Sequence, residues 1–538
     1  MSELPERAVV HEPVPVTLET DMTRRSFLLA ATGAAVVVAV LGACTAPHGE
    51  PAPVPSAEQK TTEVEALLQH AGNSLLELHS EQYGGWRFRS EIQAPHYQTD
   101  RDVGAASVGV GFLTLADQYP NDKRWVDGWV NAAKQTATWL TAVSKQDSTG
   151  GRYWPDYHDN GKESGSYYTS FDDGAIGIGD FYWQLYEKTH DPEHKDIALQ
   201  SVRWTLSQAE DIGGDAAPMY RWKWDVGSGD DTYYTGMGEG SAGIIETLAT
   251  YYQRTKDSDP AFAAMCKRYI DGGLRWLDHT RTNLGDNDGD SRAVPETGVI
   301  GQDGDTEENS GYLSGAAGLA FMYLKLHQVF GGDQYLQKAD ELFGWLNDTA
   351  DGPKVDFGDG TATWKLALDP QGGDDTHYVT GFEEGNAGIG WTYLQAYNLT
   401  HRESYLATAK QAADWLLETA MKDAKGGWSW HEYEHPASPH IHPNLNNGAA
   451  GIGMFLLDMF DATKDTKYKT AAEGVQAWLA NTAVHKGDLV YWNDTDDGTS
   501  FGKDPSWHWG SAGIIAFLAR MAGSARDVPG EQPALSSP

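Results

Sequence analysis

Acidic side chains stand directly before a glycine motif at several places in this chain. Asp173 precedes Gly-Ala-Ile-Gly, Glu239 precedes Gly-Ser-Ala-Gly and Glu384 precedes Gly-Asn-Ala-Gly. Two carboxyl groups in one site can supply the acid and the base or nucleophile that break a glycosidic bond. We therefore take Glu239 and Glu384 as candidate catalytic residues, with Asp173 as the third.

A longer element leads into two of these acids. The frame Asp-Asp-Thr-x-Tyr, then Thr-Gly, then Glu-Gly, runs from Gly229 to Gly240 and again from Gly373 to Gly385. Its acids and aromatic rings are side chains that can orient a sugar or shift the pKa of a neighbouring carboxyl group. The candidate substrate-binding residues are Asp231, Asp375, His377, Tyr233, Tyr378, Glu383, Asn447 and His508, and Asp172 and Asn446 are expected in the same cavity.

Aromatic residues are frequent in the connecting loops. Capping of a helix N-terminus is the alternative role for any single acid, because the helix dipole and free N–H groups stabilise a carboxylate there. Capping does not explain why the acids cluster with aromatic rings, whose faces stack on sugars. The rings expected at this mouth are Trp154, Trp222, Trp224, Trp364, Trp428, Trp430, Trp507, Tyr167, Tyr168 and Tyr234.

Two patterns suggest metal ions. His431-Glu-Tyr-Glu-His435 fits the zinc motif H-E-x-x-H, which needs a helix, but it follows a Gly-Gly-Trp-Ser-Trp segment and precedes Pro436, so we expect a loop. Acidic segments at Asp286 and Asn493 have calcium-like spacing and depart from the EF-hand pattern. A structural calcium ion is an alternative to plain solvated loops, and no cofactor is certain.

The glycine motif recurs seven times and predicts a repeat protein. Its first copy reads Ala106-Ser-Val-Gly-Val-Gly111, and the central glycines lie 62 to 75 residues apart, which leaves room for two helices and two loops in each unit. Since glycine lets backbones come close, the helices that it opens are expected to form an inner ring. The preceding helices carry a tryptophan that we assign to the core: Trp139, Trp204, Trp276, Trp345, Trp415 and Trp478.

Seven such pairs, with Gly-x-Ala-Gly-Ile opening the inner helices, resemble the lanthionine synthetase C-like family over about Thr61 to Gly523. The resemblance implies an all-α fold, an (α/α)7 double-layered toroid of seven inner and seven outer helices. Cyclases of that family hold zinc with two Cys and one His placed just before inner-helix glycines. The matching places read Leu313-Ser314, Glu383-Glu384 and Asn446-Asn447, so we expect neither that zinc nor thioether ring formation.

The segment before the repeats predicts export. Thr23-Arg-Arg-Ser-Phe-Leu-Leu29 matches a twin-arginine signal, and Leu41-Gly-Ala-Cys44 resembles a bacterial lipobox. Cys44 is thus the expected lipidation site, which places the protein on the outer face of the cell membrane. Translation starts at Met1 or Met22. The expected parts are a signal peptide (1–43), a Pro/Ala-rich tether (44–60), the toroid (61–524) and a disordered tail (525–538).

Charge and cysteine content limit the classes of binding partner and the disulfide bonds that this chain can have. The net charge of −37 disfavours nucleic acid and anionic lipid, so the membrane is contacted through the lipid anchor only. Besides Cys44 the chain has one cysteine, Cys266, so an acylated chain has no internal disulfide. We expect a monomer that acts on a glycan, as a glycoside hydrolase or lyase. The alternatives are a peptide-modifying relative with altered chemistry and a non-catalytic lipoprotein that binds sugar or peptide.

Overall fold

The computed structural model describes residues 57–89, 96–118, 123–229, 232–283, 308–368, 376–435, 437–493 and 503–523. Contacts divide the chain into two units, Met1–Pro55 and Ser56–Pro538, and every described residue belongs to the second. The signal, Cys44, the tail and most of both acidic segments lie outside the described residues. No helix in the described ranges is long and apolar enough to cross a membrane.

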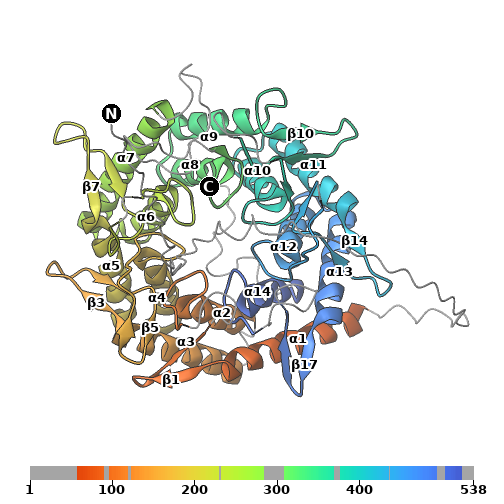
Figure 1. Cartoon of the computed structure of the whole chain (residues 1–538), viewed down its shortest axis with the longest axis horizontal. Helices are drawn as coiled ribbons and strands as arrows, with labels where there is room; N and C mark the ends of the chain where they lie inside the picture. Colours follow the sequence, from red (N-terminus) through yellow and green to blue (C-terminus); the bar gives the residue numbers. More distant parts are fainter. Residues whose placement is uncertain are drawn as a thin grey trace, which may run out of the picture. The chain divides into compact units, whose positions relative to one another are not determined.

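Fourteen helices in these ranges form two concentric layers (Figure 1). The inner helices are α2 (Ala105–Gln118), α4 (Ala175–Thr189), α6 (Ser241–Thr255), α8 (Ala316–Phe330), α10 (Asn386–Thr400), α12 (Ala449–Thr463) and α14 (Ser511–Met521). The outer helices are α1 (Ala57–Glu77), α3 (Lys123–Val143), α5 (Pro192–Ser207), α7 (Pro260–Asn283), α9 (Asp333–Leu346), α11 (Glu403–Thr419) and α13 (Thr466–Thr482). The predicted (α/α)7 toroid is confirmed.

Short antiparallel ladders connect the outer helices to the inner ones. Seven are local hairpins, whereas β9 pairs with β12 and β13 pairs with β16 from the next repeat. The strands are β1 (Ser80–Gln82), β2 (Gly85–Arg87), β3 (Lys145–Gln146), β4 (Arg152–Tyr153), β5 (His158–Asp159), β6 (Lys162–Glu163), β7 (Ala209–Asp211), β8 (Tyr220–Trp222), β9 (Glu308–Asn309), β10 (Lys354–Asp356), β11 (Ala362–Trp364), β12 (Ala367–Leu368), β13 (Tyr378–Val379), β14 (Met421–Lys422), β15 (Trp428–Ser429), β16 (Tyr433–Glu434), β17 (Val484–Lys486) and β18 (Leu489–Tyr491).

The packed helix pairs differ from the pairs that the sequence repeat predicts. Each inner helix packs on the outer helix that follows it through a short turn, as α2 does on α3 and α4 on α5. The first outer helix, α1, packs on the last inner helix, α14, and α14 packs on α2. The first and last described helices, α1 and α14, therefore close the ring.

Tryptophans hold the outer layer in two ways. Those in the outer helices are buried, which confirms their assignment to the core. Trp154, Trp222, Trp364 and Trp430, which lie in or next to the hairpins, are also buried, and the indole N–H of each donates to a carbonyl near the C-terminus of the preceding outer helix, where helix carbonyls lack partners. These bonds are Trp154 to Leu140, Trp222 to Thr205, Trp364 to Leu346 and Trp430 to Leu416, at 2.7 to 3.0 Å. These four rings are closed to solvent and do not form the aromatic mouth that the sequence suggests.

The central glycines of the motif make room for a loop. A Cβ at Gly388 would lie 1.9 Å from the carbonyl oxygen of Phe382, in the loop that enters the same helix. The close approach is thus between an inner helix and its own entry loop, and not between two helices as expected. The same clash, at 1.7 to 2.0 Å, recurs at Gly177, Gly243, Gly318, Gly451 and Gly513.

The first repeat is out of register with the sequence prediction. Gly104 directly precedes α2, as Gly174 precedes α4, and a Cβ on either would meet the backbone nitrogen four residues earlier, at 2.3 and 2.4 Å. Ser107 then takes the place of the central glycine. The predicted motif Ala106–Gly111 therefore begins two residues too late.

Candidate functional site

Seven entry loops, one before each inner helix, meet inside the ring. In six of them the residue two places before the helix-capping glycine accepts hydrogen bonds from the neighbouring loop through its carbonyl oxygen. Gly238 O, for example, accepts from the N–H groups of Phe171 and Asp172 at 3.2 and 3.1 Å. This ladder fixes the backbone from which the site side chains project. Its acceptors are Asp172, Gly238, Leu313, Glu383, Asn446 and His508.

Side chains make the contact between the seventh loop and the first. His508 Nδ1 lies 2.8 Å from Asp102 Oδ1, and the Asp102 side chain is fully buried. Asp100 holds the first loop in shape, since its Oδ1 accepts the N–H groups of Asp102, Val103 and Gly104 at 2.7 to 3.0 Å. Burial, reinforced by Asp102, raises the pKa of Asp100 well above its usual range.

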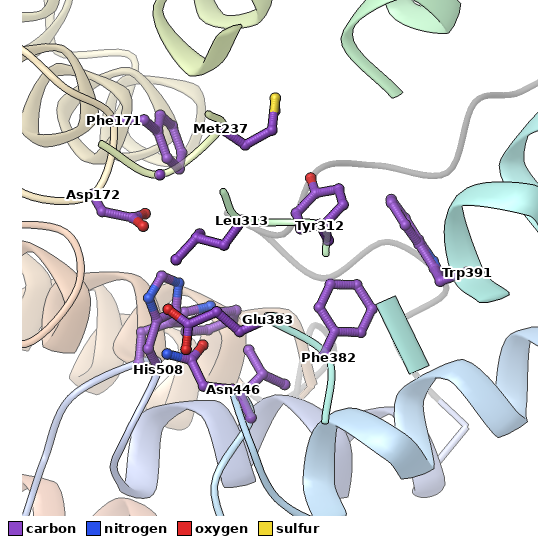
Figure 2. A pocket seen from close by; sticks show the side chains of 13 residues that line it. Phe171, Asp172, Met237, Tyr312, Leu313, Phe382, Glu383, Trp391, Asn446 and His508 are labelled. Carbon is purple, nitrogen blue, oxygen red and sulfur yellow. The ribbon is translucent and has the colours of Figure 1, made fainter. Parts of the chain in front are cut away.

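A cavity of about 570 Å³, open solvent at its mouth included, lies inside this ring of loops (Figure 2). Most of its lining comes from the residues two and three places before the helix-capping glycines. Polar groups gather on one side, and an aromatic cluster lies on another, with Tyr312 and Phe382 edge to face at 5.4 Å. The lining residues are Phe171, Asp172, Met237, Gly238, Tyr312, Leu313, Phe382, Glu383, Trp391, Leu445, Asn446, Trp507 and His508.

His508 is the cation of this cavity. Burial disfavours its charged form, but the negative charges of Asp172, Asp102 and Glu383 outweigh burial and raise the pKa of His508 to about 9. The imidazole is therefore protonated at neutral pH, and both ring nitrogens are donors. Because Nδ1 is bound to Asp102, Nε2 is the nitrogen left for a ligand.

Glycines of neighbouring loops accommodate two of the carboxylates. A Cβ at Gly238 would lie 2.4 Å from Asp172 Oδ2, so the Asp172 carboxylate packs directly on this glycine. Glu384 packs in the same way on Gly311, and the Ser314 hydroxyl donates to Glu384 Oε1 at 2.5 Å. Asp172 faces the cavity, whereas Glu384 is bound to the adjacent loop.

The structure brings some of the predicted site residues into the cavity lining and leaves others outside it. Glu383 and His508 line the cavity, as do Asp172 and Asn446. The residues one place nearer to the helix do not: these are Asp173, Glu239, Glu384 and Asn447.

Asp173 belongs to a separate aromatic cluster. It accepts the indole N–H of Trp224 at 3.3 Å, and Trp224 stacks on Tyr168 with ring centroids 4.7 Å apart.

The residues of the longer upstream element lie away from the lining. Tyr233 is 2% exposed and donates to Glu210 of β7, so its hydroxyl serves the outer hairpin. His377 packs on Tyr433, and Tyr378 stacks on His435. Asp231 and Asp375 lie outside the described residues.

Sequence reasoning missed Asp102 and most of the apolar lining. Asp102 was missed because the predicted motif of the first repeat begins two residues too late, so that Asp102 did not align with the other residues two places before a helix-capping glycine. An alignment of the repeats on the glycine that directly precedes each inner helix would have shown Phe171, Met237, Tyr312 and Phe382 at one position, three residues before it.

The described residues offer no set of metal ligands. No three His, Cys, Asp or Glu side chains in them lie together as such a set. His431–His435 runs through β16 and is not helical, as expected. Cys266 is buried in α7, and burial raises its thiol pKa to about 12. The positions that match the zinc ligands of lanthionine cyclases hold carboxylates and amides here, at Glu383–Glu384 and Asn446–Asn447.

Comparisons with known proteins agree with this architecture. Residues 384–527 match the family model of lanthionine synthetase C-like proteins. Nisin cyclase superposes with a TM-score of 0.52 at 13% identity, over 88% of this chain and 96% of that one.

Weaker superpositions also occur. A GH76 alpha-mannanase from Bacteroides thetaiotaomicron gives a TM-score of 0.45 at 11% identity, over 86% of this chain and 98% of that one. A sugar epimerase from a ruminal bacterium gives 0.45 at 15% identity, over 69% and 90%. No curated protein sequence matches the chain. The resemblance to the lanthionine synthetase C-like family is confirmed by the match over residues 384–527 and by the toroid fold.

Proposed function

We propose that this protein cleaves a glycosidic bond of a glycan held in the central cavity. The observation that carries the proposal is the placement of His508, which Asp102 fixes through Nδ1 in a cavity that also presents the carboxylates of Asp172 and Glu383. A proton donor and a carboxylate at one cavity are the two groups that glycosidic cleavage requires.

The roles follow from the atoms. His508 Nε2–H donates its proton to the oxygen that leaves with one half of the glycan. The Asp172 or Glu383 carboxylate either activates a water molecule or attacks the sugar carbon itself. In both cases water finally supplies the hydroxyl group on the sugar carbon, and its proton passes to the enzyme. Tyr312, Phe382 and Trp391 provide an apolar wall on which a sugar ring can stack. Glu384 and Asp173 bind residues of the neighbouring loops, and Glu239 with Glu384 is the alternative catalytic pair.

The location is part of the same proposal. The twin-arginine segment favours export in the folded state, and Cys44 favours a lipid anchor that holds the protein, as a monomer, outside the membrane. Its partner is then an extracellular glycan. No cofactor is needed for the proposed step, and any calcium ion would serve structure.

The test is a screen of glycans for newly formed reducing ends with the full chain, with and without chelator. We expect wild type to form product and His508→Gln and Glu383→Gln to lose at least about a hundredfold in rate, since general acid–base catalysis contributes about that much or more. The Glu239→Gln/Glu384→Gln double variant is the comparison. If it alone loses activity, the alternative pair is catalytic.

Two outcomes would contradict the proposal. Binding of a glycan without any product in all variants would identify a capture protein. Modification of a peptide, with no action on glycans, would identify the peptide-modifying alternative.

A further inference from the structure

Three aromatic rings form a platform at the entry loops. They are Tyr168 of the second loop, Trp224 of the segment after β8 and Tyr234 of the third loop, and each is half-buried. Among the described residues, none of the three belongs to the hydrophobic core or to the side chains packed against it. Trp224 stacks on Tyr168 with ring centroids 4.7 Å apart, and Tyr234 meets Trp224 edge to face at 5.5 Å. Rings that are grouped outside the core, and partly open to solvent, are typical of a ligand-binding surface.

The backbone fixes this aromatic platform in place. The Thr169 N–H donates to the carbonyl oxygen of Trp224 at 3.2 Å, and the Trp224 N–H donates to that of Thr232 at 3.0 Å. The segments that carry the three rings are therefore joined by hydrogen bonds. The indole N–H of Trp224 donates to Asp173 at 3.3 Å, which also fixes the orientation of the ring. A surface that is already ordered loses little conformational entropy when it binds a ligand.

The aromatic platform is continuous with the cavity along two entry loops. Asp173 directly follows the lining residue Asp172, and consecutive Cα atoms are about 3.8 Å apart. Tyr234 stands three residues before Met237, which also lines the cavity. A chain-like ligand that occupies the cavity beside Asp172 and continues past Asp173 therefore meets Trp224.

Polar groups at the edge of the platform indicate the chemistry of the ligand. Burial, together with the negative charges of Asp156, Asp173 and Asp225, raises the pKa of Tyr168 far above its usual range, so the phenol keeps its proton. Aromatic faces stack on the C–H face of a sugar, and phenol and carboxylate groups hydrogen-bond with hydroxyl groups. A sugar ring matches both features.

We infer that the aromatic platform binds a second sugar unit of the glycan, next to the unit in the cavity, so that the substrate is an oligosaccharide or polysaccharide chain. The inference rests on the proposed glycan cleavage. Trp224 is the ring on which this second unit stacks, and Asp173 is a positioning residue that orients the indole. The affinity for a glycan should therefore increase with chain length.

The experiment measures binding against chain length by calorimetric titration of the full chain in the His508→Gln background, where the proposed cleavage is lost. The probes are oligosaccharides of two and of six units, in separate series of mannose, glucose, xylose and N-acetylglucosamine. In the series that binds, we expect the six-unit oligomer to bind more tightly than the two-unit one. Trp224→Ala should weaken binding of the six-unit oligomer by about tenfold and reduce this preference for the longer chain.

Two further variants and a matched control support the comparison. Trp224→Phe keeps a ring but loses the bond to Asp173, so its loss should be smaller than that of Trp224→Ala. Tyr234→Ala leaves this bond in place and gives the same test if Trp224→Ala does not fold. Phe357→Ala removes a ring that is 47% exposed in the β10–β11 hairpin, and it should keep the preference for six units.

The outcomes separate this inference from the proposed function. Equal affinity for two and six units, with cleavage of some glycan by wild type, overturns the platform and leaves glycan cleavage standing. An equal loss for both lengths in Trp224→Ala also overturns it, because Trp224 then acts only through Asp173 and the cavity. Failure of the wild-type chain to bind or cleave any glycan overturns both proposals.

Discussion

At the scale of single residues, the site depends on one side-chain pair, His508 and the fully buried Asp102. Asp102 lies in the first repeat and His508 in the seventh, 406 residues apart in sequence. Their bond fixes the imidazole and also joins the two ends of the ring of loops. The residue that orients the proposed proton donor is therefore also a structural contact, and its removal should change both the pH profile and stability.

The first prediction concerns the pH profile of activity. Wild-type kcat/KM should fall as pH rises through about 9, because His508 then loses its proton. In Asp102→Asn the pKa of His508 should fall, since a buried negative partner is removed, and the basic limb of the profile should move to lower pH. Asp340→Asn, which removes a carboxylate bound to Arg402 on the outer layer, is the control and should leave the profile unchanged.

The same group affects stability with a defined sign. The pKa of His508 is higher in the folded protein than the ordinary value of about 6.5. The contribution of the protonated His508 to the free energy of unfolding is fully present below pH about 6.5 and is lost as pH rises through about 9. The loss is on the order of 3 kcal/mol, at about 1.4 kcal/mol per unit. A His508→Gln variant whose unfolding free energy declined equally over this range would contradict the assignment.

The second prediction concerns Gly238. Alanine there would place a methyl group 2.4 Å from Asp172 Oδ2 and 2.7 Å from the Leu313 side chain. We expect Gly238→Ala to displace the Asp172 carboxylate and to lower kcat/KM by about tenfold or more. Gly165→Ala, in an exposed loop with no atom within 4 Å of its Cβ, is the matched control. Equal activity of the two variants would contradict the role of Gly238 in holding the Asp172 carboxylate in a reactive position.

At the scale of elements, each inner helix and its entry loop form one unit. The loop folds back on the first helical turn, and the hydroxyl groups of Thr169 and Thr380 bind carbonyls of the next repeat at 2.9 and 2.7 Å. Thr380, in the Thr-Gly part of the second copy of the sequence frame, thus links consecutive repeats. The candidate functional side chains are those at the loop positions that face the cavity, two and three places before the helix-capping glycines.

The third prediction tests the contact between loop and helix. Gly388→Ala would place a Cβ 1.9 Å from the Phe382 carbonyl oxygen, a backbone atom that cannot move without shifting the loop. We expect a loss of about 3 kcal/mol or more in unfolding free energy. Gly344→Ala, at an exposed position in the last turn of α9 with no neighbour within 4 Å, should stabilise by up to about 0.5–1 kcal/mol. Chemical denaturation of both variants gives the comparison, and similar midpoints would contradict this role for the motif glycine.

Helix count and ring architecture could be predicted from the sequence because glycine and tryptophan recur at nearly constant spacing. The site could be predicted only to within one or two positions. A repeat shows that Glu383 and Glu384 precede a helix, but which of them faces the cavity depends on the ladder between loops. The prediction that the hairpin tryptophans line an aromatic mouth was wrong for a similar reason. A sequence does not distinguish a tryptophan whose indole N–H binds a helix carbonyl from one whose ring stacks on a sugar.

At the scale of the whole described unit, the ring is held closed by its two ends. Outer helix α1 covers α14, and it buries Leu68 and Leu75 completely. The N–H of Val490 in β18 donates to the Ser74 hydroxyl of α1 at 2.7 Å. A closed ring gains its last interface only when both ends are in place, so the stability of every repeat should depend on α1.

The fourth prediction follows from this closure. Removal of residues 1–55 should leave the melting temperature of the toroid unchanged, because the contacts place them in a separate unit. Removal of residues 1–78 should lower it strongly, since α14 loses its outer helix and each fully buried leucine of α1 contributes about 1.5–3 kcal/mol. Ser74→Ala gives an intermediate step of about 1 kcal/mol, because it removes one hydrogen-bond acceptor. Thermal unfolding followed by circular dichroism ranks the three variants. If the 1–78 deletion melted at the wild-type temperature, the ring would be stable without its closing helix, and the packing of α14 on α2, together with the bond between His508 and Asp102, would be enough to hold the first and last repeats together.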